Sequence, residues 1–282
     1  MKLTSPQVIK KIMGNSGLKF NKSLGQNFLI DDEVLAKTIK ASGVNEGYGV
    51  IEIGPGIGTL TAELAENAGK VVAIELDRQI AEYLKTAFVA YKNVEIIQGD
   101  ALKLNLNDII SEHLNGMPVV VVANLPYYIT TPLIMKFLEE ALPLESITVM
   151  IQKEVAERIV AEANTKDYGA LSVAVQFYAT PEIIVLVPPE CFMPAPKVTS
   201  AIIKIDIKNH IKPQVSHVNK FFKVIKAAFG QRRKTLVNAL SSAFEMPKDE
   251  LRKLILLVCG NENARGETLN ISQFIQICEK IH

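Results

Sequence analysis

Short runs rich in valine and isoleucine recur over the first 210 residues of the chain, and helical patterns separate the early runs. Most runs are continuously apolar rather than alternating, which is typical of strands buried on both faces of a largely parallel sheet. The runs cover Gly49–Ile53, Val71–Glu75, Val94–Gln98, Val119–Ala123, Ile147–Gln152, Ser172–Tyr178 and Val198–Ile207. The sequence therefore predicts an α/β fold with a mostly parallel, seven-stranded sheet.

Helical periodicity fills most of the early intervals and all of the chain after about residue 215. Helices are expected over Asp31–Ser42, Thr59–Asn67, Gln79–Tyr91, Pro132–Leu142, Lys153–Ala163, Val218–Phe229, Arg233–Phe244, Pro247–Cys259 and Ile271–Ile281. The turn-rich segment 187–197 separates the last two apolar runs and predicts a late hairpin-like pair. We therefore expect a basic leader over residues 1–30, a catalytic domain over 31–208 and a small all-α domain over 209–282.

Composition excludes several classes of protein. With 282 residues, of which 48% are hydrophobic and 22% charged, the chain can bury a sizeable core and is not disordered. Its apolar runs are too short for a transmembrane helix, and the leader lacks the features of a secretion signal. Three distant cysteines and four scattered histidines suggest neither a disulfide framework nor a zinc site. We expect a cytoplasmic protein without a metal.

Positive charge is concentrated at both ends of the chain. Residues 1–30 hold five lysines and no acid, and residues 207–244 hold eight cations and no acid, whereas the middle of the chain is acidic. A solvated helical face is the ordinary explanation of such a run. A long stretch without a carboxylate also suits a polyanion, because each neutralised phosphate releases counterions. Charge alone leaves both explanations open.

A glycine-rich turn follows the first predicted strand. It reads Glu52-Ile-Gly54-Pro-Gly56-Ile-Gly58-Thr59, and glycine lets a ligand approach the backbone closely. Thr59 stands where the dinucleotide fingerprint needs its third glycine, so the spacing is that of the S-adenosylmethionine (SAM) methyltransferase loop. A glycine turn that serves only close packing is the alternative.

One carboxylate follows each of the next two predicted strands. Glu75 ends the second strand, where it can accept hydrogen bonds from ribose hydroxyls. Asp100 follows the third strand, where it can accept from the amine of an adenine. Each could instead be a solvated strand-end acid. Because the glycine turn and both acids fall at the ends of successive strands, where open α/β sheets bind ligands, they favour a SAM-type cofactor over a dinucleotide.

The turn Asn124-Leu125-Pro126-Tyr127 after the fourth predicted strand fits methylation of an exocyclic amine. The N6 lone pair of adenine is delocalised into the ring, so this amine is a poor nucleophile. Hydrogen bonds to the Asn124 oxygen and the Leu125 carbonyl would make the nitrogen more tetrahedral, and Pro126 would fix the turn. Tyr127 would stack on the extruded base, and positioning would supply most of the rate. A plain strand-end turn is the alternative.

Phe192 is a second aromatic candidate for the site. It lies in the proline-braced segment Cys191-Phe-Met-Pro-Ala-Pro-Lys197. This segment could place the ring of Phe192 against the other face of the target base. A buried loop phenylalanine explains the residue equally well.

In their order, these motifs resemble the rRNA adenine N6,N6-dimethyltransferase family, and specifically its bacterial KsgA type. The resemblance runs from about residue 20 to residue 275. It is carried by Lys22–Leu29, Glu52–Gly58, Glu75–Asp77, Gly99–Ala101, Asn124–Tyr127, Gln152–Arg158, Tyr168–Gly169 and Phe192–Val198. It implies a Rossmann-like, SAM-dependent methyltransferase domain followed by a small helical domain.

The resemblance also implies a substrate and a set of site residues. The substrate would be two adjacent adenosines in the 3′-terminal hairpin loop of 16S rRNA, in an immature 30S subunit whose assembly the enzyme assists. SAM would become S-adenosylhomocysteine, and Lys22–Leu29 would cover the site. The implied catalytic positions are Asn124, Leu125, Pro126, Tyr127 and Phe192. The implied cofactor contacts are Gln26, Asn27, Leu29, Gly54, Gly56, Gly58, Glu75, Asp100, Ala101 and Asn124. The candidate RNA contacts are Lys22, Lys197, Lys223, Lys226, Arg232, Arg233 and Lys234.

The Erm enzymes, which methylate 23S rRNA, are similar to the same pattern and are the main alternative. The KsgA type is favoured by Tyr128–Pro132, Gly230–Leu236 and Ala264–Leu269. In the last segment, Gly266 replaces the usual alanine, which bears only on local helix capping. The mitochondrial transcription-factor branch is disfavoured by the complete cofactor set and by the lack of a targeting segment.

Two further classes stay open. One is a non-catalytic ribosome-assembly or nucleic-acid-binding factor that retains the fold, which the basic segment 207–244 motivates. The other is a DNA adenine methyltransferase, since the chemistry of the tetrad Asn124–Tyr127 is shared. We expect the chain to act as a monomer, with no membrane partner.

Overall fold

The computed structural model describes residues 2–15, 27–231 and 233–281, and the chain forms two compact units. The first unit contains residues up to 156 together with 181–209. The second contains residues 157–180 together with those from 210 onward. The chain therefore crosses between the units near residues 156, 180 and 209.

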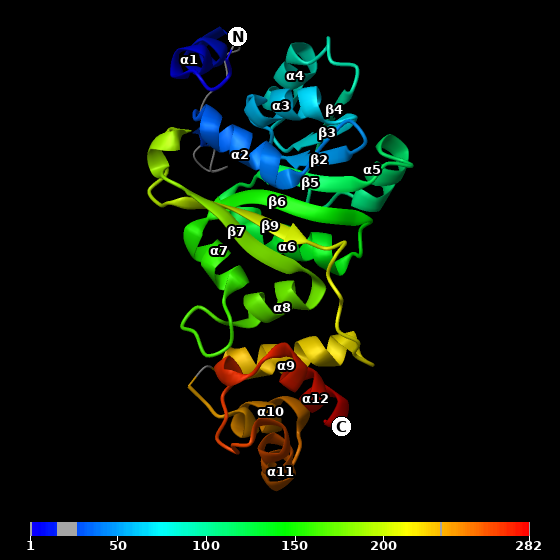
Figure 1. The fold of residues 1–282 in the computed structure, drawn as a ribbon, viewed down its shortest axis with the longest axis vertical. Coiled ribbons are helices and arrows are strands. Elements are labelled where there is room, and N and C mark those ends of the chain that lie inside the picture. Colours follow the sequence, from blue (N-terminus) through cyan, green and yellow to red (C-terminus); the bar gives the residue numbers. More distant parts are fainter. Residues whose placement is uncertain (1, 16–26, 232, 282) are drawn as a thin grey trace. The chain divides into compact units, whose positions relative to one another are not determined.

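A seven-stranded sheet organises the first unit (Figure 1). Its strands lie in the order β4-β3-β2-β5-β6-β9-β7. The first five are parallel neighbours, and β9 runs antiparallel to β6. The strands are β2 (Gly49–Ile53), β3 (Lys70–Glu75), β4 (Val94–Gln98), β5 (Val119–Asn124), β6 (Leu144–Gln152), β7 (Thr180–Val187) and β9 (Ser200–Asp206). The prediction of a mostly parallel α/β sheet is confirmed.

The centre of the sheet is where the strand order reverses. From β2 the chain builds outward through β3 and β4, and from β5 it builds outward on the other side through β6. Strand β2 is buried along its whole length, and β5 up to its last residue, as their continuous apolar sequences require. The crevice beyond the carboxyl ends of two such strands is where this architecture binds ligands.

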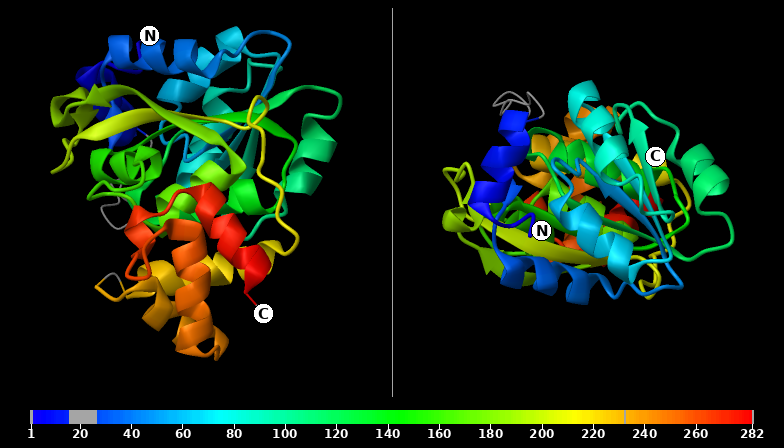
Figure 2. Two further views of the ribbon diagram at one scale, coloured as in Figure 1. Left: turned by 60° about the horizontal axis from the view of Figure 1, so that its bottom comes forward. Right: turned by 90° about the horizontal axis from the view of Figure 1, so that it is seen from above.

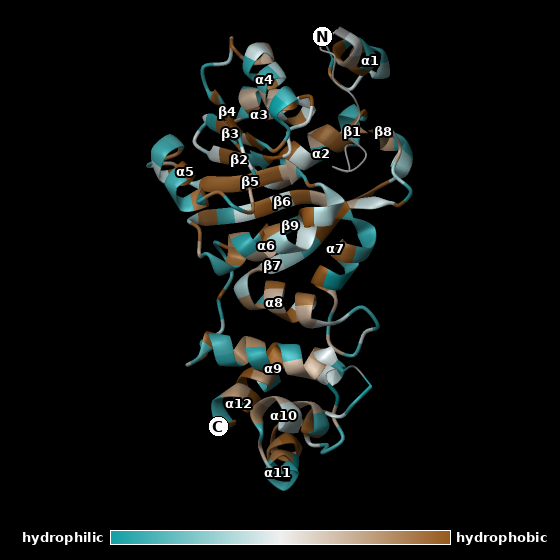
Figure 3. Ribbon diagram, turned by 180° about the vertical axis from the view of Figure 1, so that it is seen from behind, coloured by the Kyte–Doolittle hydropathy of each residue, from teal (hydrophilic) through white to brown (hydrophobic). Residues whose placement is uncertain are grey.

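Helices cover both faces of the sheet. Residues of α2 and α3 join one apolar cluster with β2, β3 and β5. Figure 1 shows α2 on the near face of the sheet. Figure 3, from behind, shows α6 on the other face and much of β5 and β6 in the brown of hydrophobic residues. The helices of this unit are α1 (Pro6–Asn15), α2 (Asp32–Ser42), α3 (Thr59–Asn67), α4 (Arg78–Ala87), α5 (Leu106–His113), the 3-10 turn η2 (Tyr127–Ile129), α6 (Thr130–Glu139), the start of α7 (Lys153–Val160) and η3 (Pro189–Cys191).

A two-stranded ribbon joins the start of the first unit to a loop far along the chain. Strands β1 (Phe28–Leu29) and β8 (Phe192–Met193) pair antiparallel, with Leu29 opposite Phe192. The thiol of Cys191 donates to Asp31 Oδ2 at 3.3 Å. The other oxygen of Asp31 accepts from the backbone N–H groups of Glu33 and Val34 and so caps α2. This loop is thereby held beside the segment that precedes α2.

The second unit is helical and has its own aromatic core. Phe177, Phe221 and Phe274 are fully buried in it, and the rings of Phe177 and Phe221 stack with their centroids 4.8 Å apart. Figure 2 shows the orange and red C-terminal helices of this unit packed together. Its elements are the end of α7, α8 (Ala170–Tyr178), α9 (Val218–Gly230), α10 (Leu236–Phe244), α11 (Lys248–Cys259), η4 (Gly266–Thr268) and α12 (Ile271–Lys280).

The predicted strand over Ser172–Tyr178 is wrong, because this segment forms most of helix α8. Ser172, Val173, Ala174, Val175 and Phe177 are all buried, so the helix has almost no polar face to reveal its period. The seventh strand is instead β7, in which Pro181 is compatible with a place at the edge of the sheet. Helices α1 and α5 were also missed. No helix among the described residues has both the length and the apolar character needed to cross a membrane.

Candidate functional site

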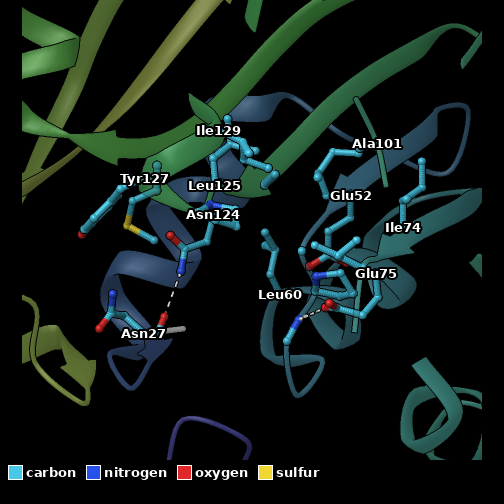
Figure 4. Close-up of a pocket in the computed structure, with 18 of the residues that line it drawn as sticks. Asn27, Glu52, Leu60, Ile74, Glu75, Ala101, Asn124, Leu125, Tyr127 and Ile129 are labelled. Carbon is cyan, nitrogen blue, oxygen red and sulfur yellow. Dashed lines mark hydrogen bonds between the residues drawn. The ribbon is translucent and has the colours of Figure 1, made fainter. Parts of the chain in front are cut away.

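A cavity of about 180 Å³ opens at the carboxyl ends of β2, β3, β4 and β5, where the strand order reverses (Figure 4). The turns after all four strands contribute to its wall, and so does β1. The sequence-predicted residues that line it are Asn27, Leu29, Gly54, Gly56, Glu75, Asp100, Ala101, Asn124, Leu125, Pro126 and Tyr127. The structure therefore brings most of the expected cofactor and catalytic positions into one cavity.

The glycine turn has two parts with different surroundings. Gly54 and Gly56 line the cavity with φ of 67° and 58°, a region that L side chains rarely adopt. A Cβ on Gly56 would lie 2.9 Å from Cε1 of Phe28. Gly58, with φ of 89°, does not line the cavity, and a Cβ there would lie 2.5 Å from Cε2 of Phe88. Close packing against α4 and its end thus accounts for Gly58.

Glu75 is a buried carboxylate held by the backbone. Its Oε1 accepts from the N–H of Asp77 at 2.9 Å, and its Oε2 accepts from the N–H of Gly56 at 3.4 Å. Burial raises the pKa of Glu75, while these two N–H groups act in the opposite direction. The carboxylate lines the cavity at the end of β3, as expected for an acceptor of ribose hydroxyls.

Asp100 lies beside Glu75, after β4. Its Oδ1 accepts from the N–H of Leu102 at 3.0 Å, and its Oδ2 lies 3.6 Å from the Nζ of Lys103. The N–H of Gly99 donates to the carbonyl of Glu75 at 2.9 Å, which ties the ends of β3 and β4 together. Asp100 and Ala101 thereby form the side of the cavity next to Glu75.

The side-chain amide of Asn124 is oriented by a residue that lies 97 positions earlier in the chain. Its Nδ2 donates to the backbone carbonyl of Asn27 at 3.2 Å (Figure 4). A carbonyl can only accept, so the nitrogen must point toward Asn27 and the oxygen Oδ1 is the group left for another donor. Asn124 can therefore present an acceptor in the cavity.

Hydrogen bonds fix the turn that follows Asn124. The N–H of Leu125 donates to the carbonyl of Met150 at 3.1 Å. The carbonyl of Pro126 accepts from the N–H of Ile129 and from the hydroxyl of Thr130, both at 3.2 Å. Because the Pro126 carbonyl is engaged by the start of α6, the Leu125 carbonyl is the acceptor of this turn that a ligand can use.

Tyr127 lines the cavity with its ring, and its hydroxyl is anchored. The hydroxyl shares a hydrogen bond of 2.7 Å with the Oγ of Ser200, a fully buried residue at the start of β9. Burial raises the pKa of Tyr127. The anchored ring is thus a fixed flat surface, which suits the stacking of a base.

Several predicted residues are placed elsewhere or lie outside the described residues. Phe192 is buried opposite Leu29 and does not line the cavity. Gln26, together with Lys22 and Arg232, lies outside the described residues. Among the described residues, no cluster of His, Cys, Asp or Glu side chains is arranged to hold a metal ion.

Among the lining residues with no role assigned from the sequence, Glu52 and Thr59 each have a buried oxygen without a hydrogen-bond partner among the described residues. Glu52 is buried at the end of β2, and its Oε2 has no hydrogen-bond partner among the described residues. Burial raises the pKa of Glu52 to about 8, and the nearby charge of Glu75 adds to this effect. The buried hydroxyl of Thr59 also lacks a partner among the described residues. Glu52 belongs to the glycine motif, so its position at a strand end was an available signal.

The candidate RNA-contacting cations that the structure describes are exposed. Lys223 and Lys226 lie on α9, and Arg233 and Lys234 follow that helix in the same unit. The Nζ of Lys223 lies 4.4 Å from the ring centroid of Phe244. Lys197 is exposed in the first unit.

Comparisons with known proteins agree along nearly the whole chain. A family model described as "Ribosomal RNA adenine dimethylase" matches residues 17–282. A relative from Alkaliphilus oremlandii, named "Ribosomal RNA small subunit methyltransferase A", is 50% identical over 274 residues, covering 97% of this chain and 96% of its own. A relative of the same name from Clostridioides difficile is 46% identical over 273 residues, covering 97% and 94%.

Solved structures of similar fold cover most of the chain. A dimethyladenosine transferase from Plasmodium falciparum has a TM-score of 0.74 at 25% identity, covering 89% of this chain and 95% of its own. The 23S rRNA methyltransferase ErmE has a TM-score of 0.68 at 24% identity, covering 90% and 99%. At that identity, the likeness to ErmE concerns the fold alone.

Proposed function

Because the chain belongs to the ribosomal RNA adenine dimethylase family, we propose that it dimethylates the N6 amines of two adjacent adenosines in the 3′-terminal hairpin loop of 16S rRNA, with SAM as methyl donor. The name shared by its relatives points to the small ribosomal subunit. The proposed substrate is the immature 30S subunit, on which the chain acts as a cytoplasmic monomer. One observation carries the proposal: the Asn124–Tyr127 turn lines the same cavity as Glu75 and Asp100.

The cavity fits SAM by its donors, acceptors and space. The two glycines of its wall, Gly54 and Gly56, have positive φ and lack side chains, so a ligand can approach their backbone closely. Glu75 is set to accept from the ribose hydroxyls, and Asp100 from the amine of the cofactor's adenine. Asn27 and Leu29 close the side next to Asn124. When bound, SAM supplies an electrophilic methyl group on a sulfonium.

Asn124 prepares the target amine for attack. Its Oδ1 and the Leu125 carbonyl accept the two N–H groups of the adenine amine, which draws the nitrogen toward tetrahedral geometry and directs its lone pair away from the ring. The Nδ2 contact with Asn27 holds the acceptor in this direction before the base arrives. Positioning therefore supplies most of the acceleration.

Tyr127 receives the base after it leaves its stack. Its ring replaces the lost stacking, and the hydroxyl bond to Ser200 prevents the ring from turning away. The amine becomes acidic as it gains a methyl group, so its proton can pass to water and no side chain has to act as a base. In the second methylation the amine has one N–H left, so one of the two acceptors can engage it while the base stays stacked on Tyr127.

The exposed cations of the second unit are proposed to bind the rRNA. Lys223, Lys226, Arg233 and Lys234 lie within the stretch 207–244, which has no carboxylate. Contacts of such cations with phosphates give affinity that falls as salt rises. The proposed division is a catalytic domain over residues 31–208 and an rRNA-binding domain over 209–282, with Lys197 as a contact from the first.

Methyl transfer from radiolabelled SAM tests the proposal. Unmodified 30S subunits and unmodified 23S rRNA are supplied in parallel, and labelled nucleosides are separated by chromatography. N6,N6-dimethyladenosine from the 30S subunits alone is the expected result. Label in 23S rRNA alone would identify an Erm-type activity, and label in neither, with tight binding of 30S precursors, would identify a non-catalytic assembly factor.

A further inference from the structure

The cavity has an unusual charge composition. Three carboxyl groups line it, those of Glu52, Glu75 and Asp100, and the described lining residues include no lysine, arginine or histidine. Figure 4 shows the side chains of Glu52 and Glu75 next to one another. Such a cavity attracts a cation and disfavours three ionised carboxylates together.

The three carboxyl groups differ in how their charge is supported. Glu75 accepts from two backbone N–H groups, and Asp100 accepts from one N–H group and lies near the Nζ of Lys103. Glu52 is 1% exposed, and its Oε2 has no hydrogen-bond partner among the described residues. The hydroxyl of Thr61 favours the charged form of Glu52, but a buried carboxylate oxygen without a donor is costly, so Glu52 is the group of the three that takes up a proton most readily.

Four other ionisable groups of the cavity lie around Glu52. Glu75 faces it from β3, Asp100 follows β4, and Tyr127 and Tyr128 follow β5. On α3, Thr61 is the neighbouring polar group. Burial raises the pKa of Glu52 to about 8 and also raises those of Glu75, Tyr127 and Tyr128, but the pKa of Glu75 is lowered in turn by its two backbone N–H donors.

The donor and the product of methyl transfer differ in charge. SAM has a sulfonium, an ammonium and a carboxylate, so it carries one net positive charge. S-adenosylhomocysteine has a neutral thioether in place of the sulfonium and carries no net charge. A cavity that senses this difference can favour the donor over a product of almost the same shape.

We propose that Glu52 makes this cavity selective for a cationic ligand: it holds a proton while the cavity is empty or contains a neutral ligand, and it loses that proton to solvent when a cation enters. After methyl transfer the ligand loses its charge, Glu52 takes a proton back from solvent, and the product is held less firmly than the donor. This inference rests on the proposed function for the identity of the two ligands.

Calorimetry on the full chain tests the inference without measuring catalysis. SAM and S-adenosylhomocysteine are titrated between pH 6.0 and 7.5 in buffers of different ionisation enthalpy, which gives the number of protons released. With the wild type, SAM is expected to release close to one proton more than S-adenosylhomocysteine. The preference for SAM is expected to rise by up to about tenfold per pH unit.

Two variants complete the design. In Glu52→Gln the extra proton and the pH dependence of the preference are expected to disappear, and the preference at pH 7 to fall about tenfold. Glu95→Gln removes an exposed carboxylate from β4 and is expected to match the wild type. Both ligands also carry an amino group that titrates at about pH 8, and the comparison of the wild type with Glu52→Gln cancels its contribution.

The possible results separate the inference from the proposed function. Equal proton release by the wild type and Glu52→Gln would refute the role of Glu52 while leaving SAM as the cofactor. Failure of both ligands to bind would overturn the inference and the assigned cofactor together. If Glu52→Gln does not fold, carbon-13 NMR of the wild-type carboxyl decides: titration near the ordinary range of glutamate in the free protein would refute the inference.

Discussion

Replacement of Asn124 by alanine separates the chemical role of this residue from its structural role. The variant loses the acceptor for the target amine and leaves the Asn27 carbonyl without its donor. Loss of one preorganised hydrogen bond of this kind lowers kcat by about 10²–10³-fold, or about 3–4 kcal/mol. The structural loss is one ordinary hydrogen bond of a half-buried group, about 1 kcal/mol in the free energy of unfolding.

Asn124→Asp refines this prediction. A carboxylate keeps an acceptor but cannot donate to the carbonyl of Asn27, so its direction is no longer fixed. We expect methyl transfer intermediate between that of the wild type and that of Asn124→Ala. Asn107→Ala, which removes an exposed asparagine from α5, is the matched control and is expected to transfer methyl groups at the wild-type rate.

The assay is single-turnover methyl transfer to unmodified 30S subunits at saturating SAM, with urea unfolding of each variant in parallel. Saturation removes any contribution from weaker cofactor binding. A rate for Asn124→Ala within tenfold of the wild type would refute the assigned role. Loss of activity matched by a loss of several kcal/mol in stability would show that Asn124 acts through folding instead.

Four further predictions address other parts of the structure. Tyr127→Phe should keep methyl transfer within about fivefold because the stacking ring remains, whereas Tyr127→Ala should lose about 10–100-fold; equal rates would exclude stacking. Gly58→Ala should lower the free energy of unfolding by about 2–4 kcal/mol in urea, since its Cβ would meet Phe88 and its φ is positive; an unchanged midpoint would contradict this. Burial raises the pKa of Glu52 to about 8, so Glu52 loses its proton at lower pH in the unfolded state than in the folded state. The free energy of unfolding of the wild type should therefore fall relative to that of Glu52→Gln by up to about 1.4 kcal/mol per pH unit between pH 5 and 7.5. A constant difference would show that Glu52 is not protonated in the folded protein. Lys223→Ala should weaken 30S binding and reduce the slope of log affinity against log salt by about one, and an unchanged slope would remove this lysine from the RNA contact.

The buried strands of the sheet were the most predictable part of the fold. Strands β2 and β5 follow apolar runs almost residue for residue, because burial on both faces favours an apolar side chain at nearly every position. The same rule gave a wrong prediction of a strand at α8, whose buried residues also form a nearly continuous apolar run. Length and period do not distinguish these cases, since what surrounds α8 comes from helices 40 or more residues later in the chain.

Helix α1 carried a signal that the expected leader obscured. Ile9, Ile12 and Met13 recur at helical spacing and are buried, and Pro6 begins the helix. The lysines between them supported the prediction of a basic leader instead. Strand β7 was not predicted for another reason: at the edge of the sheet its residues alternate between exposed and half-buried up to the buried Val187, although most of them are apolar.

The candidate site was predictable where residues act at the ends of strands. Glu75, Asp100 and Asn124 follow successive predicted strands, and parallel strands bring their carboxyl ends together. The orientation of the Asn124 amide was not predictable, because the carbonyl that fixes it lies 97 residues away. The same limit applies to Tyr127, whose partner Ser200 lies 73 residues away.

Mass spectrometry of 16S rRNA from cells tests the central claim most directly. A strain without its own enzyme for this modification receives the wild-type chain or Asn124→Ala, and the 3′-terminal fragment of the 16S rRNA is analysed. The wild type is predicted to restore two adjacent N6,N6-dimethyladenosines, and Asn124→Ala to leave both adenosines unmodified. Unmodified adenosines with the wild type, or full dimethylation with Asn124→Ala at equal protein levels, would contradict the account.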